Sequence, residues 1–127
     1  MFPVVIIMSI KGQYYTGALN RLGRDSGVFL EQRFVMDGVP CVAASIESAN
    51  CLDVTVGTNA TGDKHTCKTI LMLADAGGTG MKVEHIQDGV CLTLDGVTEL
   101  ETLIKALQFA VGVLELQAYC ATARDEQ

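Results

Sequence analysis

The chain of 127 residues contains no tryptophan, two prolines and two histidines, and only 6% of its residues are aromatic. Charged residues are also few, at 19%, and fifteen acidic against nine basic residues give a net charge of −6. Nucleic-acid binding depends on clustered cations that displace counterions from phosphates, so this balance disfavours that class of function. The hydrophobic content of 49% excludes intrinsic disorder and predicts a single globular domain over residues 1–127.

Long apolar runs are missing as well. The N-terminal run of residues 1–10 is shorter than the roughly twenty residues that a membrane-spanning helix needs. It also lacks the basic segment and the cleavage motif of a signal peptide, so we expect a buried strand over 3–10, with Met8 as an alternative start of the chain.

The cysteines do not form the even, closely spaced set of a disulfide framework. We therefore expect free, mostly buried thiols and a cytoplasmic location for the five residues concerned, which are Cys41, Cys51, Cys67, Cys91 and Cys120.

Short segments of alternating apolar residues predict a series of further strands, over 28–36, 40–46, 51–57, 67–74, 81–86 and 90–94. Asp37-Gly38 and Asp88-Gly89 predict tight turns, because both residue types tolerate positive φ. The glycine-rich residues 75–80 lack the following helix of a phosphate-binding loop, so we expect a hairpin turn there and an antiparallel meander of three strands. Residues 11–27 are predicted mainly as loop, with a short helical turn around 18–22 as the alternative.

One long helix is predicted at the C-terminus, over about 98–118. Thr98 and Glu101 have the spacing of a capping box, and the polar tail 121–127 is expected to fray. Together these elements predict an α+β fold, in which a curved, mostly antiparallel sheet of six or seven strands packs on this helix. An open sheet and a partly closed barrel both fit the pattern.

Two apolar stripes follow the predicted helix when residues are placed at 100° steps. The larger is expected to pack on the sheet and comprises Leu100, Leu103, Ile104, Leu107, Ala110, Val111, Leu114 and Ala118. The opposite stripe contains Ala106, Phe109, Val113 and Leu116. It is covered either by the N-terminal part of the chain or by a second subunit. Exposed apolar stripes mark contact surfaces and twofold dimers are the commonest assemblies, so we predict a homodimer with Phe109, Val113 and Leu116 in the interface.

Motifs that carry chemistry are scarce. No serine lies in a Gly-x-Ser-x-Gly elbow, and His65, Cys67 and His85 lack the paired spacing of structural zinc sites. A Cys/His pair requires Cys67 or Cys91 to approach His85 across strands. We therefore predict no catalytic residue, no metal and no cofactor.

The segment best suited to contact a ligand is 11–27. Tyrosine offers a flat surface with a hydrogen-bonding tip, and arginine recognises carboxylate or phosphate groups. Tyr14, Tyr15, Arg21 and Arg24 would line the mouth of a pocket between helix and sheet. The alternative is a solvated loop whose tyrosines cover the edge of the core.

Three functions follow from these patterns. The first is a non-enzymatic binding or interaction module that is dimeric through its C-terminal helix, and the second is a small-ligand-binding or hydrolytic α+β domain. A strand meander followed by a long helix, over 67–118, also resembles single-stranded nucleic-acid-binding folds related to transcription coactivators. The binding that this resemblance implies is disfavoured by the net charge and by the few cations near the meander, Lys64, Lys68 and Lys82.

Overall fold

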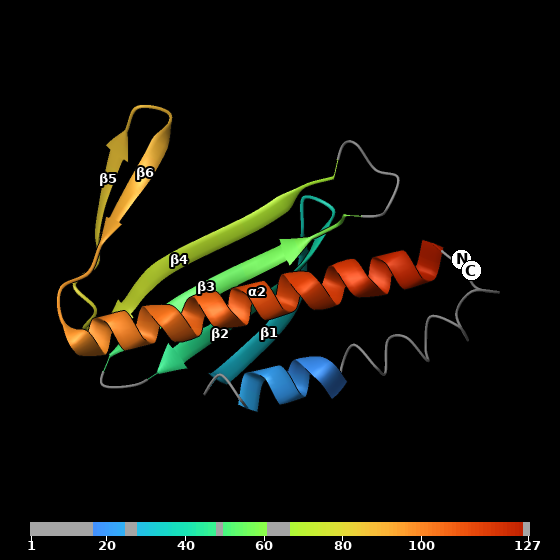
Figure 1. Ribbon diagram of the computed structural model, residues 1–127, viewed down its shortest axis with the longest axis horizontal. Coiled ribbons are helices and arrows are strands. Elements are labelled where there is room, and N and C mark those ends of the chain that lie inside the picture. Colours follow the sequence, from blue (N-terminus) through green and yellow to red (C-terminus); the bar gives the residue numbers. More distant parts are fainter. Residues whose placement is uncertain (1–16, 25–27, 48–49, 61–66, 126–127) are drawn as a thin grey trace.

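The computed structural model describes residues 17–24, 28–47, 50–60 and 67–125. The described residues form six strands, a long C-terminal helix and a short helix over 17–24 (Figure 1). The elements are β1 (Val28–Met36), β2 (Val39–Glu47), β3 (Cys51–Thr58), β4 (Thr69–Gly77), β5 (Lys82–Ile86), β6 (Gly89–Thr93) and α2 (Val97–Asp125). The predicted α+β class is confirmed, while the strand expected over 3–10 lies outside the described residues.

The strands form two antiparallel sheets, and not the single sheet that the sequence predicts. One sheet has the order β1-β2-β3-β4, and β5 pairs only with β6 in a separate hairpin. β4 pairs with β3, with Val54 opposite Leu73, so the first pairing of the meander expected over residues 67–94 is wrong. Its second pairing, of β5 with β6, is confirmed. The larger sheet ends at β1 and β4 and is not a closed barrel. The resemblance to coactivator-related folds was drawn on residues 67–118, whose strands belong to two different sheets.

The turns follow the local sequence closely. Asp37 and Gly38 have φ values of 52° and 78° and connect β1 to β2, as predicted. Asp88, with φ of 58°, lies in the turn of the hairpin. Residues 75–80 do not form a hairpin turn, because β4 continues to Gly77 and the chain then leads into the β5–β6 hairpin.

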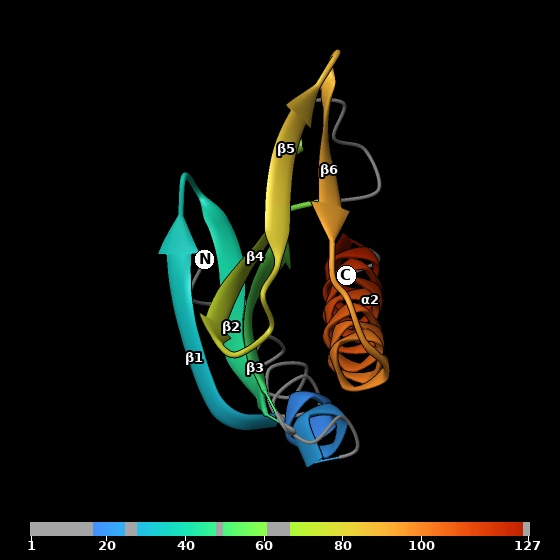
Figure 2. The same ribbon diagram turned by 90° about the vertical axis from the view of Figure 1, so that its left-hand side faces the viewer.

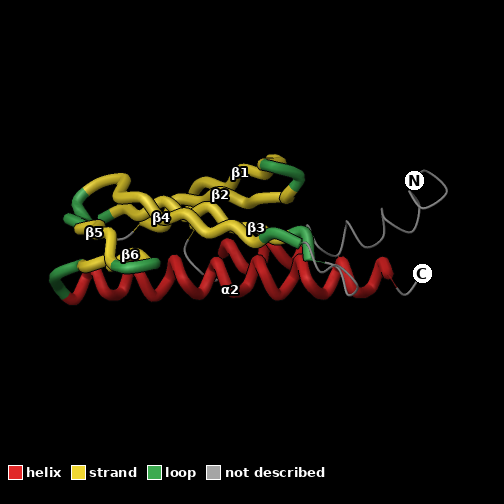
Figure 3. The backbone as a smooth tube through the Cα atoms, turned by 90° about the horizontal axis from the view of Figure 1, so that it is seen from above, coloured by secondary structure: helices red, strands yellow, loops and turns green. Residues whose placement is uncertain are grey.

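α2 lies against one face of the four-stranded sheet and packs chiefly on β3 (Figures 2 and 3). The alternate residues of β3 that face it, Leu52, Val54 and Val56, are completely buried. The core they share with the helix comprises Leu19, Val42, Ala44, Ile46, Leu52, Val54, Val56, Ala106, Phe109, Ala110 and Val113.

The side of α2 that packs on the sheet is the one expected to face a second subunit. Phe109 and Val113 are completely buried in the core, and Leu116 is partly buried against it. The predicted orientation of Phe109 and Val113 is therefore wrong, because a residue inside the core of one chain is not available to a partner. Leu116 lies at the edge of the same core. Of the stripe predicted to face the sheet, only Ala110 is fully buried.

A short helix over 17–24 replaces the loop predicted for that part of residues 11–27. Leu19 is completely buried in the core, and Leu22 packs against α2 at Gly112. A Cβ atom at position 112 would lie 2.7 Å from the methyl carbons of Leu22, so the glycine permits this close approach. The short helix thus covers one flank of α2.

The ends of α2 also differ from the prediction. The carbonyl of Gly96 accepts a hydrogen bond from the Leu100 amide at 3.1 Å, so Gly96, and not Thr98, caps the helix. The Thr98 hydroxyl instead donates to the Glu99 carboxylate at 2.9 Å, which lowers the pKa of Glu99. The helix extends to Asp125, beyond the end predicted near residue 118, and residues 121–125 of the predicted tail are helical.

Two valines on α2 give a direct test of this orientation. Val113 is completely buried and Val111 is 54% exposed. We expect Val113→Ala to lower the free energy of unfolding by about 2 kcal/mol and Val111→Ala by less than about 0.5 kcal/mol. Urea denaturation at low protein concentration measures both, and equal effects, or the larger effect at Val111, would show that the opposite face is buried.

Candidate interaction surface

Polar side chains fix α2 on the sheet at two points of its buried face. The amide of Gln117 accepts a hydrogen bond from the Thr58 backbone N–H and donates one to the Pro40 carbonyl, each at 2.7 Å. Near the other end, the Thr102 hydroxyl donates to the side chain of Asn50. Thr102, Gln117 and Asn50 are all buried, and buried polar groups are stable only when they are paired. These contacts define which side of the helix faces outward.

The outward side of α2 carries an apolar stripe that no described element covers. We call it the outer stripe, and it consists of Leu100, Ile104, Leu107 and Val111, which are 42–54% exposed. The short helix lies against the other flank, at Gly112, and leaves this one open. Exposed apolar groups that lie contiguously on a surface mark sites of contact with other molecules.

β4 adds to the exposed apolar surface. Its residues are largely exposed, and on the face that it shares with Val56, Leu71 is 52% exposed. The next residue on that face, Leu73, is partly buried against the core. Because α2 packs chiefly on β3, the helix leaves the outer part of β4 uncovered.

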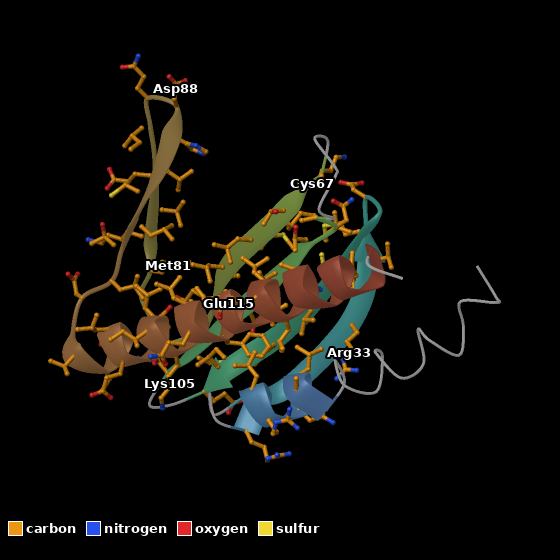
Figure 4. All side chains as sticks on the ribbon, turned by 45° about the vertical axis from the view of Figure 1, so that its right-hand side comes forward. Arg33, Cys67, Met81, Asp88, Lys105 and Glu115 are labelled. Carbon is orange, nitrogen blue, oxygen red and sulfur yellow. The ribbon has the colours of Figure 1, made fainter. Side chains whose placement is uncertain are left out.

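The β5–β6 hairpin projects from the body of the protein and packs extensively on no other described element (Figures 1 and 2). Met81 at its base is still packed against the core, whereas Asp88 lies at the free tip (Figure 4). Every residue of β5 is exposed, including Val83 and Ile86. The hairpin is thus a second apolar surface without a partner in the described chain.

Asp75, at the end of β4, holds the connection that leads into the hairpin. One carboxylate oxygen accepts hydrogen bonds from the backbone N–H groups of Gly77 and Thr79, at 2.9 and 3.3 Å. The other accepts from the Gly80 N–H at 3.1 Å. The Thr79 side chain beside the carboxylate, together with these amides, lowers the pKa of Asp75. The ionised carboxylate therefore orders the backbone at the base of the hairpin.

The residues predicted to bind a ligand do not come together as a described site. Arg21 and Arg24 lie exposed on the short helix, and Tyr14 and Tyr15 lie outside the described residues. Asn20, between the two arginines and the tyrosines in sequence, accepts a hydrogen bond from Arg33 of β1 at 3.4 Å.

The Cys/His pair considered from the sequence does not form within the hairpin. His85 is opposite Val90 and Cys91 is opposite Glu84, so the histidine and the cysteine point to opposite faces. Cys67 lies near the start of β4, far from the hairpin (Figure 4). His65 lies outside the described residues. Among the residues that are described, no three histidine, cysteine, aspartate or glutamate side chains group closely enough to hold a metal ion.

The four cysteines whose side chains the structure describes are free thiols, as predicted, and the side chain of Cys120 lies outside that description. Burial is less general than expected, because Cys41 is buried and Cys51 half-buried, but Cys67 and Cys91 are exposed. Burial raises the pKa of Cys41, and burial together with the carboxylates of Asp53 and Glu47 raises that of Cys51. A thiol with a raised pKa is a weak nucleophile at neutral pH.

Comparisons with known proteins give no further guide. No protein-family model, no curated protein and no solved structure matches this chain. Neither described helix is both long and apolar enough to cross a membrane.

The base of the hairpin gives a prediction for Asp75. We expect Asp75→Ala to speed hydrogen exchange at the Gly77 and Gly80 amides about five- to tenfold, because one hydrogen bond contributes about 1 kcal/mol. Asp88→Ala, at the hairpin tip, is the control and should leave both amides unchanged. NMR-detected exchange measures the effect.

The same contacts predict a pH dependence. The pKa of Asp75 is lowered in the folded protein, so the stabilisation is present above the ordinary aspartate pKa and is lost as the pH falls through the folded value. The amide chemical shifts of Gly77 and Gly80 should therefore titrate with a midpoint below 3.8. A midpoint at or above that value would show that the carboxylate does not hold the turn.

Proposed function

We propose that this protein is a non-enzymatic interaction module that forms a homodimer through α2. The proposal rests on the outer stripe, four large apolar side chains on one flank of a helix whose opposite side is fixed in the core. It keeps the dimer predicted from the sequence but moves the interface from Phe109, Val113 and Leu116 to the outer stripe. A twofold axis is the simplest closed arrangement of two such surfaces.

The position of the thiols favours an interaction role in a reducing compartment such as the cytoplasm. Cys41 and Cys51 have raised pKa values, which makes them poorly suited to nucleophilic catalysis. Cys67 and Cys91 are exposed, and exposed free thiols persist where glutathione and thioredoxin keep them reduced.

A substitution in the outer stripe tests the dimer. We expect the wild-type chain to sediment as a dimer at micromolar concentration. Ile104→Gln with Leu107→Gln should weaken association at least about 100-fold, because two half-exposed apolar side chains per subunit lose their contact. The helix should persist by circular dichroism, since glutamine is a good helix former.

The control introduces the same residue on the polar flank of α2. Glu101→Gln with Glu115→Gln changes two exposed positions and should leave the dimer intact or strengthen it by removing like charges. A monomeric wild type would refute the proposal, and so would a stripe variant that dimerises as tightly as the wild type.

A further inference from the structure

The β5–β6 hairpin has two chemically different faces. Residues directly opposite in an antiparallel pair point to the same side, and Val83 is opposite Leu92 while His85 is opposite Val90. Val83, His85, Val90 and Leu92 therefore share one side, which we call the apolar face of the hairpin because three of its four side chains are apolar. These three, Val83, Val90 and Leu92, are 40–55% exposed. The other face carries Lys82, Glu84 and Cys91 together with Ile86.

A hairpin of this kind is not expected to be stable by itself. Two isolated strands are marginal in water, and a third strand or a helix packed on an apolar face is normally needed. Within the described chain neither sheet nor helix supplies that cover. The hairpin rises beyond the β4 side of the body and stands between the planes of the sheet and of α2, pointing away from both (Figures 1 and 3). No described element therefore packs extensively on its apolar face.

The outer stripe is the other apolar surface that no described element covers. It is apolar and exposed, and the hairpin of its own chain projects away from it (Figure 2). A second copy of the chain supplies a match for both surfaces at once. In a twofold dimer, a contact of the hairpin with the partner's stripe is repeated by the reciprocal contact, which closes the assembly.

The areas support a second copy as the occupant. A standard interface buries about 800 Å² per partner, of which about 65%, or about 500 Å², is apolar in homodimers. The outer stripe alone offers on the order of 200 Å² of exposed apolar side-chain area. The apolar face of the hairpin and Leu71 raise the total to on the order of 400 Å², close to what a stable dimer needs.

Charge is compatible with the same occupant. The outer stripe, Leu71 and the apolar face of the hairpin contain no aspartate, glutamate, lysine or arginine, and their one polar side chain is His85. Two chains that each carry a net charge of −6 therefore meet through uncharged surfaces. Repulsion between their remaining carboxylates is screened over about 8 Å at physiological ionic strength.

We propose that the β5–β6 hairpin is an exchanged arm, whose apolar face packs on the outer stripe of a second copy of this chain. The inference rests on the dimer proposed above and adds which surface of one subunit meets which surface of the other. In the proposed dimer the hairpin of each subunit contacts the outer stripe of the other subunit. In the alternative dimer the two hairpins contact each other and the two outer stripes contact each other. Mixing a hairpin variant with a stripe variant distinguishes the two arrangements.

The first experiment alters the arm. The arm variant is Val83→Thr, Val90→Thr and Leu92→Thr, which keeps residues that favour strands but removes apolar contact. We expect its dimer dissociation constant, measured by sedimentation equilibrium, to rise at least about tenfold. Ile86→Thr changes an equally exposed residue on the opposite face and should stay within about threefold of the wild type. Circular dichroism and the urea midpoint check that the four-stranded sheet and α2 are unchanged.

The second experiment mixes the arm variant with the stripe variant, Ile104→Gln with Leu107→Gln. In the proposed dimer neither variant retains an intact contact with itself. The mixed dimer keeps one, between the arm of the stripe variant and the stripe of the arm variant. Differently tagged chains should therefore associate at least about tenfold more tightly with each other than either does with itself.

The outcomes separate the two proposals. A monomeric wild-type chain refutes both the dimer and the exchanged arm. This is the result expected if another part of the same chain covers these surfaces. A wild-type dimer that the arm variant leaves intact refutes only the exchanged arm, and the outer-stripe dimer stands. Mixed chains that associate more weakly than either variant alone would show arm-to-arm and stripe-to-stripe contact, which also overturns the exchanged arm.

Discussion

The placement of α2 on the sheet depends on pairing polar groups inside an apolar contact. Phe109 and Val113 would pack on almost any apolar sheet face, and by themselves they specify little. Thr102 and Gln117 are more selective, because they have to reach Asn50 at one end and the end of the β2–β3 ladder at the other. A rotated helix would turn Thr102 and Gln117 toward water and leave the buried Asn50 side chain and Thr58 backbone N–H without these partners, at a cost of about 1–3 kcal/mol for each. The outward position of the outer stripe is a consequence of that constraint.

This also explains why the sequence predicts the elements well and the face of the helix wrongly. Strands and tight turns depend on alternation and on residues such as Asp37 and Gly38, which act locally. The buried face of α2 contains Thr102, Gln117 and two alanines, so it looks less apolar than the leucine-rich outer stripe. Its polar members are suitable for the core only because of Asn50, Thr58 and Pro40, which lie 52 to 77 positions away in sequence. No helical pattern contains that information.

The separate hairpin has a similar origin. Pairing β4 with β3 and pairing it with β5 both satisfy the alternation of residues 67–94, and the glycine-rich residues 75–80 resemble an ordinary hairpin turn. What differs is Asp75, whose carboxylate collects three backbone N–H groups and directs the chain away from the sheet after Gly77. An aspartate beside glycines is typical of turns in general. The sequence therefore indicates that the strand ends near residue 77, but not in which direction the chain continues.

The high hydrophobic content acquires a more specific meaning from this arrangement. Apart from Phe34 and Val35 of β1, the large apolar side chains that the core leaves exposed lie on α2, on β4 and on the projecting hairpin. Within one chain the hairpin projects away from α2, and the two surfaces do not meet. Under the proposed exchange of arms, the hairpin is stabilised only when a partner's helix covers it, so its local order and the association of subunits become one equilibrium. This coupling requires that α2 is held firmly in each subunit. A helix that was free to rotate would bury its outer stripe against its own sheet, without a partner.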